Sequence, residues 1–319
     1  MLQFAASAVE AGLETLPLVE ALREAFRGRV TTPSRHHHTI KVPGEPDATL
    51  LLMPAWREGR YAGVKIVTVF PGNSARGEPS VMGTYLLLSG LSGAPLASID
   101  GRMLTLRRTA CASALAASYL ARADAQRLLM VGTGALAPQL ILAHAAVRPI
   151  SEVLVWGRAP EKAERLAAVL DGRRLRVRAT ADLEGAVGGA DVISCATMSR
   201  TPLVLGRWLK PGQHVDLVGG YTPEMREVDD EAISRSRVYV DTEAATHEAG
   251  DIAQPLANGT LTPPQIAGDL AELAQGRVHG RSFHDQITLF KSTGTALEDL
   301  AAAVYLFEQA RGEEPAGLR

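Results

Sequence analysis

At residues 128–137 the chain reads Leu128-Leu129-Met130-Val131-Gly132-Thr133-Gly134-Ala135-Leu136-Ala137. An apolar run that ends at a G-x-G-x-x-A turn is typical of a β-strand that leads into a helix beside a dinucleotide phosphate. Gly132 allows the tight turn, Gly134 lets backbone N–H groups approach a pyrophosphate, and Ala137 lets the helix pack closely on the strand. Because apolar strands before glycine-rich turns are common, the motif predicts a dinucleotide site only together with its surroundings.

From residue 127 onward, short apolar segments alternate with segments of helical periodicity. The pattern predicts strands at 127–131, 152–156, 175–178, 191–195, 213–218 and 237–240, with helices at 134–147, 160–170 and 181–187. Such alternation is typical of a parallel sheet covered on both faces. We therefore expect an α/β fold with a Rossmann-type, doubly wound parallel sheet, followed by helices over 243–280.

The part of the chain before residue 109 has a different pattern. We expect one or two helices over 7–27, interrupted at Pro17, and then strands at 35–42, 49–53 and 63–70 and a hairpin of 85–88 with 95–99. An alanine-rich helix over 109–123 is expected to link this α+β lobe to the parallel sheet. A last helix is expected at 296–311.

Length and composition limit the functional class. The chain has 319 residues, of which 46% are hydrophobic and 21% charged, and its formal net charge is −2. These values are typical of a globular protein with two domains and argue against a nucleic-acid partner. Neither a membrane span nor a secretory signal is expected. Cys111 and Cys195 lie far apart, which indicates reduced thiols and a cytoplasmic protein.

The second predicted strand of the parallel sheet ends in Trp156-Gly157-Arg158. An NAD-binding domain usually presents an acidic residue to the ribose 2′-hydroxyl at this distance from the glycine turn. Here Gly157 makes room and Arg158 supplies a guanidinium, which favours NADP(H) over NAD(H), with NAD(H) still possible. The alternative is that Arg158 lies on a surface loop.

Three cations of the first lobe, Arg35, Lys65 and Arg108, are candidates for a binding site. Lys65 lies in a strand otherwise made of valine and isoleucine, where it either points to solvent or enters a site. No metal site is expected at His36-His37-His38, because adjacent strand residues point to opposite faces.

Two further strands end in segments that could contact a ligand. Thr197 follows one strand and Gly219-Gly220-Tyr221 follows the next, and the carboxyl ends of parallel strands face the ligand crevice. We interpret Cys195 as a small buried thiol rather than a nucleophile.

Several motifs together resemble the ornithine cyclodeaminase/mu-crystallin family. They are Leu104-Thr105-Leu106-Arg107-Arg108-Thr109-Ala110, the G-x-G-x-x-A turn, Val218-Gly219-Gly220, and Ile287-Thr288-Leu289-Phe290-Lys291-Ser292 through Ala296-Leu297-Glu298-Asp299. The resemblance covers nearly the whole chain. It implies a homodimer and nicotinamide-dependent chemistry at a carbon–nitrogen bond. It also implies a Rossmann NAD(P)-binding domain, residues 117–290, inserted in a substrate-binding and dimerisation lobe made of residues 1–116 and 291–319.

The resemblance also implies site residues. Arg35, Lys65 and Arg108 match residues that hold the carboxylate of the substrate, with Lys65 and Arg108 expected to be catalytic. Matches to cofactor-contacting positions are Ser80, Arg108, Thr109, Ala135, Leu136, Thr197, Val218, Gly219 and Ser292; Gly132, Gly134, Gly157 and Arg158 join them from the motifs above.

Two departures from the family pattern concern the substrate. Tyr221 stands where ornithine cyclodeaminases have an aspartate after the glycine pair, and Leu51 stands where they have a glutamate for the distal amine of ornithine. A leucine cannot bind that ammonium group. The segments at 221–227 and 290–299 instead resemble bacterial ketimine reductases, which implies reduction of Δ1-pyrroline-2-carboxylate or Δ1-piperideine-2-carboxylate to L-proline or L-pipecolate. The alternatives are an ornithine cyclodeaminase, an alanine-type amino acid dehydrogenase, or a non-catalytic NADPH and small-ligand binding protein of the mu-crystallin type.

Overall fold

The computed structural model describes residues 1–172 and 174–312 and divides the chain into two compact units. The first unit contains Met1–Arg108 and the segment that starts at Thr295, and the second contains Thr109–Gly294. The sequence predicts these boundaries after residue 116 and before residue 291. The helix that was expected to link the lobes therefore begins in the first unit.

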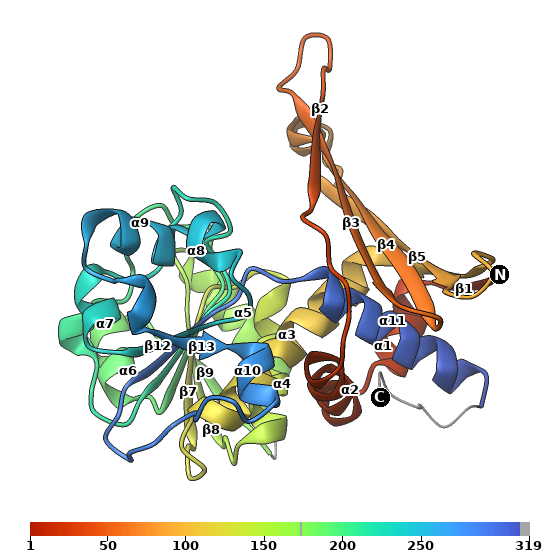
Figure 1. Ribbon diagram of the computed structural model, residues 1–319. Helices are drawn as coiled ribbons and strands as arrows, with labels where there is room; N and C mark the ends of the chain where they lie inside the picture. The colour runs from red at the N-terminus through yellow and green to blue at the C-terminus, as the bar shows by residue number, and fades with distance from the viewer. Residues whose placement is uncertain (173, 313–319) are drawn as a thin grey trace. The chain divides into compact units, whose positions relative to one another are not determined.

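The first unit is built on a six-stranded sheet with the order β1-β6-β5-β4-β3-β2 (Figure 1). β1 is parallel to β6, and the other neighbours are antiparallel. The antiparallel pairing of β5 with β6 confirms the predicted hairpin of 85–88 with 95–99. The strands are β1 (Leu2–Phe4), β2 (His36–Ile40), β3 (Ala48–Arg57), β4 (Tyr61–Val69), β5 (Val81–Ser89) and β6 (Pro95–Asp100). The helices are α1 (Ala6–Gly12), α2 (Thr15–Arg27), the 3-10 turn η1 (Pro71–Arg76) and α11 (Ala296–Ala310).

One face of this sheet is covered by α11, which packs on β3, β4 and β5. Met53, Lys65 and Tyr85 are directly opposite one another on these three strands, and all three side chains are buried. Because side chains in such a row share a face, Lys65 lies on the covered side of the sheet.

The second unit is an eight-stranded parallel sheet with the order β13-β12-β14-β11-β10-β7-β8-β9. This confirms the predicted doubly wound fold. Its strands are β7 (Arg127–Val131), β8 (Glu152–Trp156), β9 (Arg176–Ala179), β10 (Val192–Cys195), β11 (His214–Leu217), β12 (Arg237–Val240), β13 (Ile266–Asp269) and β14 (Thr288–Lys291). Its helices are α4 (Leu136–Val147), α5 (Pro160–Leu170), α6 (Leu183–Gly189), η2 (Gly206–Trp208), α7 (Asp230–Ser234), α8 (Ala245–Glu248), α9 (Gly250–Asn258), η3 (Pro263–Gln265) and α10 (Leu270–Ala274).

The direction of strand addition reverses between β7 and β10, which are neighbours in the sheet although β8 and β9 separate them in the chain. In open α/β sheets, ligands bind outside the carboxyl ends of the strands at such a reversal. β14 comes from the end of the unit and pairs between β11 and β12. The fold therefore brings the segment after β14 to the same sheet edge.

Three expectations about elements are wrong. Pro17 does not interrupt the first helical segment: it is the third residue of α2, where the missing N–H costs no hydrogen bond, and the break falls at Leu13 and Glu14. α3 (Gly101–Leu120) begins earlier than predicted, because Asp100 caps it by accepting a hydrogen bond from Met103 N at 2.7 Å. Arg108 is therefore inside the helix and not ahead of it. The region over 243–280 contains a strand, β13, besides its helices.

None of the helices in the described part of the chain is long and apolar enough to cross a membrane.

Candidate active site

A cluster of buried charges lies in the first unit, where β4 and α3 meet the first turn of α11. Lys65 on β4 is 3% exposed, and its Nζ lies 2.8 Å from Oδ2 of Asp299. Arg108 on α3 donates from Nε to Oδ1 of Asp299 at 2.9 Å and from Nη1 to Oε2 of Glu298 at 2.6 Å. Asp299 therefore bridges the two cations that the sequence singled out.

The charges of this cluster alter one another's proton affinity. Burial lowers the pKa of Lys65 to about 8; Asp299 counteracts the shift, and Arg108 adds to it. Burial opposes the charge of Arg108, but Asp299 and Glu298 outweigh it and raise the pKa of that guanidinium. Likewise, Lys65 and Arg108 outweigh burial and hold the pKa of Asp299 below its usual value. Lys65 is thus protonated at neutral pH, but it can release its proton near pH 8.

The other predicted substrate residues of this unit lie on or beside the same sheet. Leu51 shares the face of Lys65, because its partner Val67 is two residues from Lys65 on β4. Arg35 is half-buried and directly precedes β2. Because His36 is paired with Leu52, Arg35 lies opposite Met53 if the same register continues for one more residue. The structure thus brings Lys65 and Arg108 together on the carboxylate of Asp299. It places Arg35 beside the cross-strand row of Met53, Lys65 and Tyr85, at its Met53 end.

Sequence reasoning missed three residues here. Glu298 and Asp299 carried the family resemblance but no assigned role; the signal was a pair of acids that opens an otherwise apolar helix. Tyr85, opposite Lys65 on β5, is fully buried, and its hydroxyl has no hydrogen-bond partner among the described residues. A Cβ at Gly63 would overlap the ring of Tyr85, so glycine is required there.

The glycine turn after β7 has the geometry of a phosphate cradle. Gly132 has a φ of +121°, which favours glycine, and a Cβ there would lie 2.6 Å from the carbonyl oxygen of Ala196. A Cβ on Gly134 would meet nothing within 4 Å. The N-cap of α4 is Ala135, whose side chain makes no capping bond. Ala137 N donates to the carbonyl oxygen of Gly134 at 3.0 Å and Pro138 has no N–H, so in the described structure the N–H of Leu136 is what this first turn offers to an anion. These features fit the pyrophosphate of a dinucleotide.

At the carboxyl end of β8, Gly157 and Arg158 follow Trp156. A Cβ on Gly157 would lie 2.8 Å from Cγ2 of Thr133, so a larger residue would crowd the glycine turn. Arg158 is exposed and makes no hydrogen bond or ion pair within residues 1–172 and 174–312. Its guanidinium is available to an anionic ligand.

After β10, the loop at Thr197 is held by Glu227. The backbone N–H and the hydroxyl of Thr197 both donate to Oε1 of Glu227, at 2.7 and 2.8 Å. Glu227 is fully buried, and its own N–H donates to Oδ1 of Asp251 at 2.7 Å. Burial raises the pKa of Glu227 to about 7; Lys291 lowers it, and Asp251 raises it further.

After β11, the Gly219-Gly220 turn lies against the same group. A Cβ on Gly219 would overlap the backbone of Thr197, and Gly220 has a φ of +57°. The ammonium of Lys291 donates to the carbonyl oxygen of Gly219 and lies 3.2 Å from Oδ2 of Asp251. Sequence reasoning missed the roles of Glu227, Asp251 and Lys291, although Lys291 is a charge in an otherwise apolar strand.

The remaining predicted cofactor residues lie at several places. In the second unit, Ser292 follows β14 and donates from its N–H to the carbonyl oxygen of Leu217 at 3.0 Å, and its hydroxyl donates to Asp241 at 3.3 Å. Val218 follows β11, and Leu136 opens α4. Ser80 directly precedes β5 in the first unit, and Thr109 follows Arg108 on α3.

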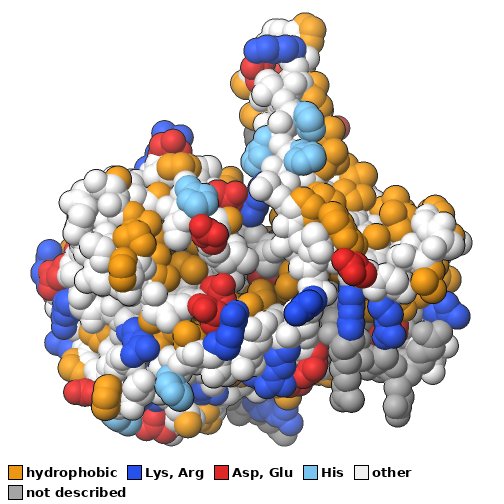
Figure 2. Space-filling model, in the orientation of Figure 1, with side chains coloured by type: hydrophobic (Ala, Val, Ile, Leu, Met, Phe, Trp, Pro, Cys, Tyr) orange, Lys and Arg blue, Asp and Glu red, His pale blue; other side chains and the backbone are white. Residues whose placement is uncertain are grey.

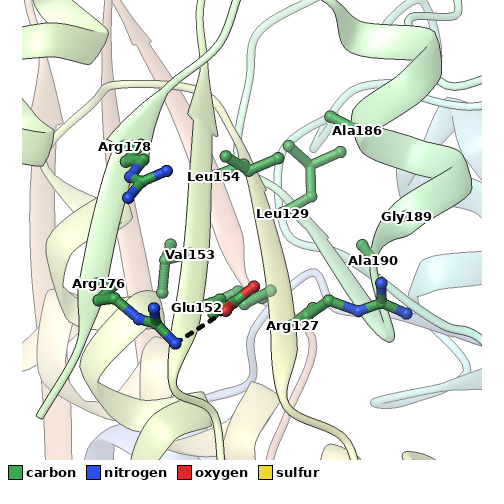
Figure 3. A pocket seen from close by; sticks show the side chains of 11 residues that line it. Arg127, Leu129, Glu152, Val153, Leu154, Arg176, Arg178, Ala186, Gly189 and Ala190 are labelled. Carbon is green, nitrogen blue, oxygen red and sulfur yellow. Dashed lines mark hydrogen bonds and ion pairs between the residues drawn. The ribbon is translucent and has the colours of Figure 1, made fainter.

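A cavity of about 290 Å³ in the second unit lies away from these residues (Figure 3). It opens on the sheet face beside α6, and its lining includes Arg127, Glu152 and Arg176 at the amino ends of β7, β8 and β9. Since ligands of parallel sheets bind at the carboxyl ends, we do not assign the cofactor to this cavity.

Other chemistries find little support. Cys195 is fully buried, and burial together with Glu227 raises the pKa of its thiol, so it is unreactive as a nucleophile. His36 and His38 are exposed, and no group of three or more histidine, cysteine, aspartate or glutamate side chains among the described residues is arranged to hold a metal ion.

A model of the ornithine cyclodeaminase/mu-crystallin family matches residues 4–314. The chain belongs to this family. The match confirms the resemblance that the motifs indicate, and it includes all the predicted site residues.

Several members of this family are similar to the chain over almost its whole length. A Δ1-pyrroline-2-carboxylate reductase of Paracoccus denitrificans is 41% identical over 290 residues, which cover 90% of this chain and 90% of the relative. The structure of the Thermococcus litoralis Δ1-pyrroline-2-carboxylate reductase, in complex with NADH and L-proline, has a TM-score of 0.90 and 32% identity and covers 98% of each chain. An archaeal alanine dehydrogenase dimer with bound NAD has a TM-score of 0.89 and 30% identity, over 98% of this chain and 96% of that one.

Proposed function

We propose that this family member reduces a cyclic ketimine, Δ1-pyrroline-2-carboxylate or its six-membered homologue Δ1-piperideine-2-carboxylate, to L-proline or L-pipecolate. The observation that carries the proposal is the buried Lys65–Asp299–Arg108 cluster, which offers an acid and a carboxylate-binding cation side by side. The names of the similar reductases support this substrate class.

Arg108 and Arg35 would bind the carboxylate of the substrate. An arginine carries five N–H donors, and Asp299 and Glu298 accept from two of those of Arg108. The other three have no partner among the residues that the structure describes and can bind a ligand. Glu298 and Asp299 hold the guanidinium in place, which fixes the orientation of the bound carboxylate and of the carbon beside it.

Lys65 would supply the proton to the ring nitrogen. Its lowered pKa makes the ammonium a stronger acid than an exposed lysine, and Asp299 keeps it charged at neutral pH. A bound nicotinamide cofactor supplies the hydride.

The second unit would hold that cofactor. The pyrophosphate would lie at Gly132, Gly134 and the N-terminus of α4, and the nicotinamide beside Thr197 and Gly219. We further propose a preference for NADP(H), because Arg158 is exposed, charged and without a partner in the described structure where a 2′-phosphate would lie.

Leu51 and Tyr221 argue against ornithine as the substrate. Leu51 is half-buried on the face of Lys65 and offers an apolar surface to ring methylenes, whereas an ammonium group there would be left unpaired. Tyr221 is 57% exposed at the end of the glycine loop and has no carboxylate to handle a released amine.

We also propose that the first unit forms a homodimer through its sheet. On the face opposite Lys65, β4 and β5 carry apolar side chains, of which Ile66 is 37% and Met82 46% exposed, while Val64, Leu86 and Leu88 are half-buried. Figure 2 shows hydrophobic side chains along this sheet. A second copy of the same face would remove them from water.

The test is an absorbance assay with the purified protein, NADPH or NADH, and each cyclic ketimine. Oxidation of the cofactor that depends on the ketimine supports the proposal. Ammonia release from L-ornithine with NAD, without ketimine reduction, would show a cyclodeaminase, and NADH formation from L-alanine would show an alanine dehydrogenase. Dinucleotide binding without any turnover would show a binding protein.

A further inference from the structure

Thr197 lies where three loops of the parallel sheet meet. A Cβ on Gly132 would lie 3.4 Å from Cγ2 of Thr197, and a Cβ on Gly219 would overlap its backbone. These are the loops that follow β7, β10 and β11, on both sides of the point where the strand order reverses. Thr197 itself is half-buried, so part of this residue remains accessible to a ligand.

The hydrogen bonds of Thr197 leave it nothing to donate. Its backbone N–H can only donate, and it does so to Oε1 of Glu227 at 2.7 Å, so Oε1 is an acceptor. The hydroxyl donates to the same oxygen at 2.8 Å. A hydroxyl has one proton and two lone pairs, and one lone pair receives the N–H of Ser199 at 3.3 Å. What remains for a ligand is a lone pair.

Glu227 is held so that this arrangement persists. Its N–H and that of Val228 donate to Oδ1 of Asp251, at 2.7 and 3.2 Å, and Asp251 is paired with Lys291. Oε2 of Glu227 has no hydrogen-bond partner in the described part of the chain. When Glu227 takes up a proton, Oε2 is therefore the oxygen that carries it, and Oε1 still accepts from Thr197.

The nicotinamide half of a dinucleotide would lie over this side of the sheet. The glycine turn after β7 fits the pyrophosphate and Arg158 after β8 suits the adenosine ribose, which leaves the strands beyond the reversal, β10 and β11, for the other half. The ring carries a carboxamide whose NH₂ is a hydrogen-bond donor.

We propose that Glu227 is a positioning residue that fixes the hydroxyl of Thr197 as a hydrogen-bond acceptor for the carboxamide NH₂ of the nicotinamide. The inference rests on the proposed cofactor. It adds that, in the contact that orients the nicotinamide ring, the protein accepts the hydrogen bond and the cofactor donates it. Without Glu227, the hydroxyl of Thr197 could donate a hydrogen bond to a ligand as well as accept one. It would then no longer favour a ligand group that donates.

The test compares the binding of two oxidised dinucleotides by calorimetry, without turnover. One is NAD⁺, or NADP⁺ if the phosphate is required, and the other is its 3-acetylpyridine analogue, which keeps the carbonyl oxygen but has a methyl group in place of the NH₂. The wild type is expected to bind the carboxamide form about 5- to 10-fold more tightly. Thr197→Ser should keep this preference, and Thr197→Val should abolish it.

Variants of Glu227 test the positioning role. Glu227→Gln retains an acceptor oxygen and should keep the preference, whereas Glu227→Ala and Glu227→Met should reduce it to about that of Thr197→Val. Circular dichroism checks that each variant is folded. Glu227→Met keeps the side-chain volume, so it replaces the alanine variant in the comparison if Glu227→Ala does not fold.

The results that would contradict the proposed cofactor differ from those that would contradict this inference alone. A wild type that binds neither dinucleotide at millimolar concentration overturns the proposed cofactor and this inference with it. A wild type that binds both forms equally, a Thr197→Val that keeps the preference, or a folded Glu227→Ala or Glu227→Met that keeps it overturns the inference alone.

Discussion

A lysine in a strand of valine and isoleucine has two interpretations, and burial decides between them. Lys65 is buried because Asp299 compensates its charge, and the acid lies far along the chain, at the start of α11. Local sequence shows the unusual residue but not its partner. The same holds for Glu227 and Lys291, whose neighbours come from other elements, whereas Arg158 is exposed and its availability follows from its place after β8.

At Lys65, activity should depend on pH through its acid form. Since the protonated lysine is the proton donor, kcat/KM for the ketimine should fall as pH rises through about 8. Asp299→Asn removes the carboxylate that favours the charge, so the fall should shift to lower pH, with kcat/KM reduced at least about tenfold. The measurement is kcat/KM against pH for both proteins.

The matched variant is Lys65→Met, which should lose turnover while dinucleotide affinity stays at the wild-type value. A pH profile that Asp299→Asn leaves unchanged would contradict the assignment of the acid.

Arg158 should determine which dinucleotide is preferred. Arg158→Ala removes a charged hydrogen-bond donor and should weaken NADPH binding by about tenfold or more, while NADH binding changes little. Arg178 is a suitable control, because it is exposed on β9, faces the cavity at the amino ends of the strands, and has no partner among the described residues. If Arg178→Ala weakens NADPH binding as much as Arg158→Ala does, the preference comes from the net positive charge of this region and not from a contact between Arg158 and the 2′-phosphate.

The loops at the carboxyl ends of β7, β10 and β11 pack against one another, because Gly132 and Gly219 let their backbones approach closely. The sequence predicts these strands and the glycine turn, since apolar runs and G-x-G-x-x-A are local patterns. It does not predict β13, or the place of β14 between β11 and β12, because pairing of parallel strands is a contact between distant segments. Lys291 reaches the Gly219 loop only through that pairing.

The glycine turn gives a test that separates folding from binding. Gly134→Ala meets nothing within 4 Å and needs no positive φ, so the thermal stability should stay near that of the wild type. The added methyl group would stand where the pyrophosphate approaches, so the dinucleotide Kd should rise at least about tenfold. Gly189→Ala in α6 is the control, since its Cβ also meets nothing within 4 Å. Equal Kd values for the two variants would place the dinucleotide elsewhere.

The buried carboxyl of Glu227 should make stability depend on pH. Its pKa is about 7 in the folded protein, above the ordinary value of 4.5, so the folded state binds the proton more tightly. This contribution is complete below about pH 4.5 and is lost as pH rises through 7. Asp251, Lys291 and Cys195 also lie around this carboxyl, so the comparison is made with Glu227→Gln, which leaves them in place.

Between pH 5 and 8, the free energy of unfolding of the wild type should fall relative to that of Glu227→Gln, by up to about 3 kcal/mol. Urea unfolding at several pH values measures the difference. Parallel curves for the two proteins would show that Glu227 does not titrate in this range.

The first unit exposes apolar side chains on one face of its sheet and buries a charged cluster on the other. We expect Ile66→Lys combined with Met82→Lys to convert the proposed dimer to a monomer, because two lysines would be buried between like copies. Light scattering after size-exclusion chromatography gives the mass. Leu91→Lys is the control, since Leu91 is 84% exposed outside that face and should leave the mass unchanged. A double variant with the wild-type mass would place the contact on another surface.

The doubly wound sheet, the glycine turn and the family could be predicted from the sequence alone, because periodicity, turn residues and motifs are properties of neighbouring positions. The sequence also singled out Lys65 and Arg108 as unusual cations. The folded structure was needed to show that both bind Asp299, that Glu227 accepts hydrogen bonds from Thr197, and that Lys291 donates to Gly219. These are contacts between segments far apart in the chain, and a buried charge is stable only where the fold places its partner within a few ångströms.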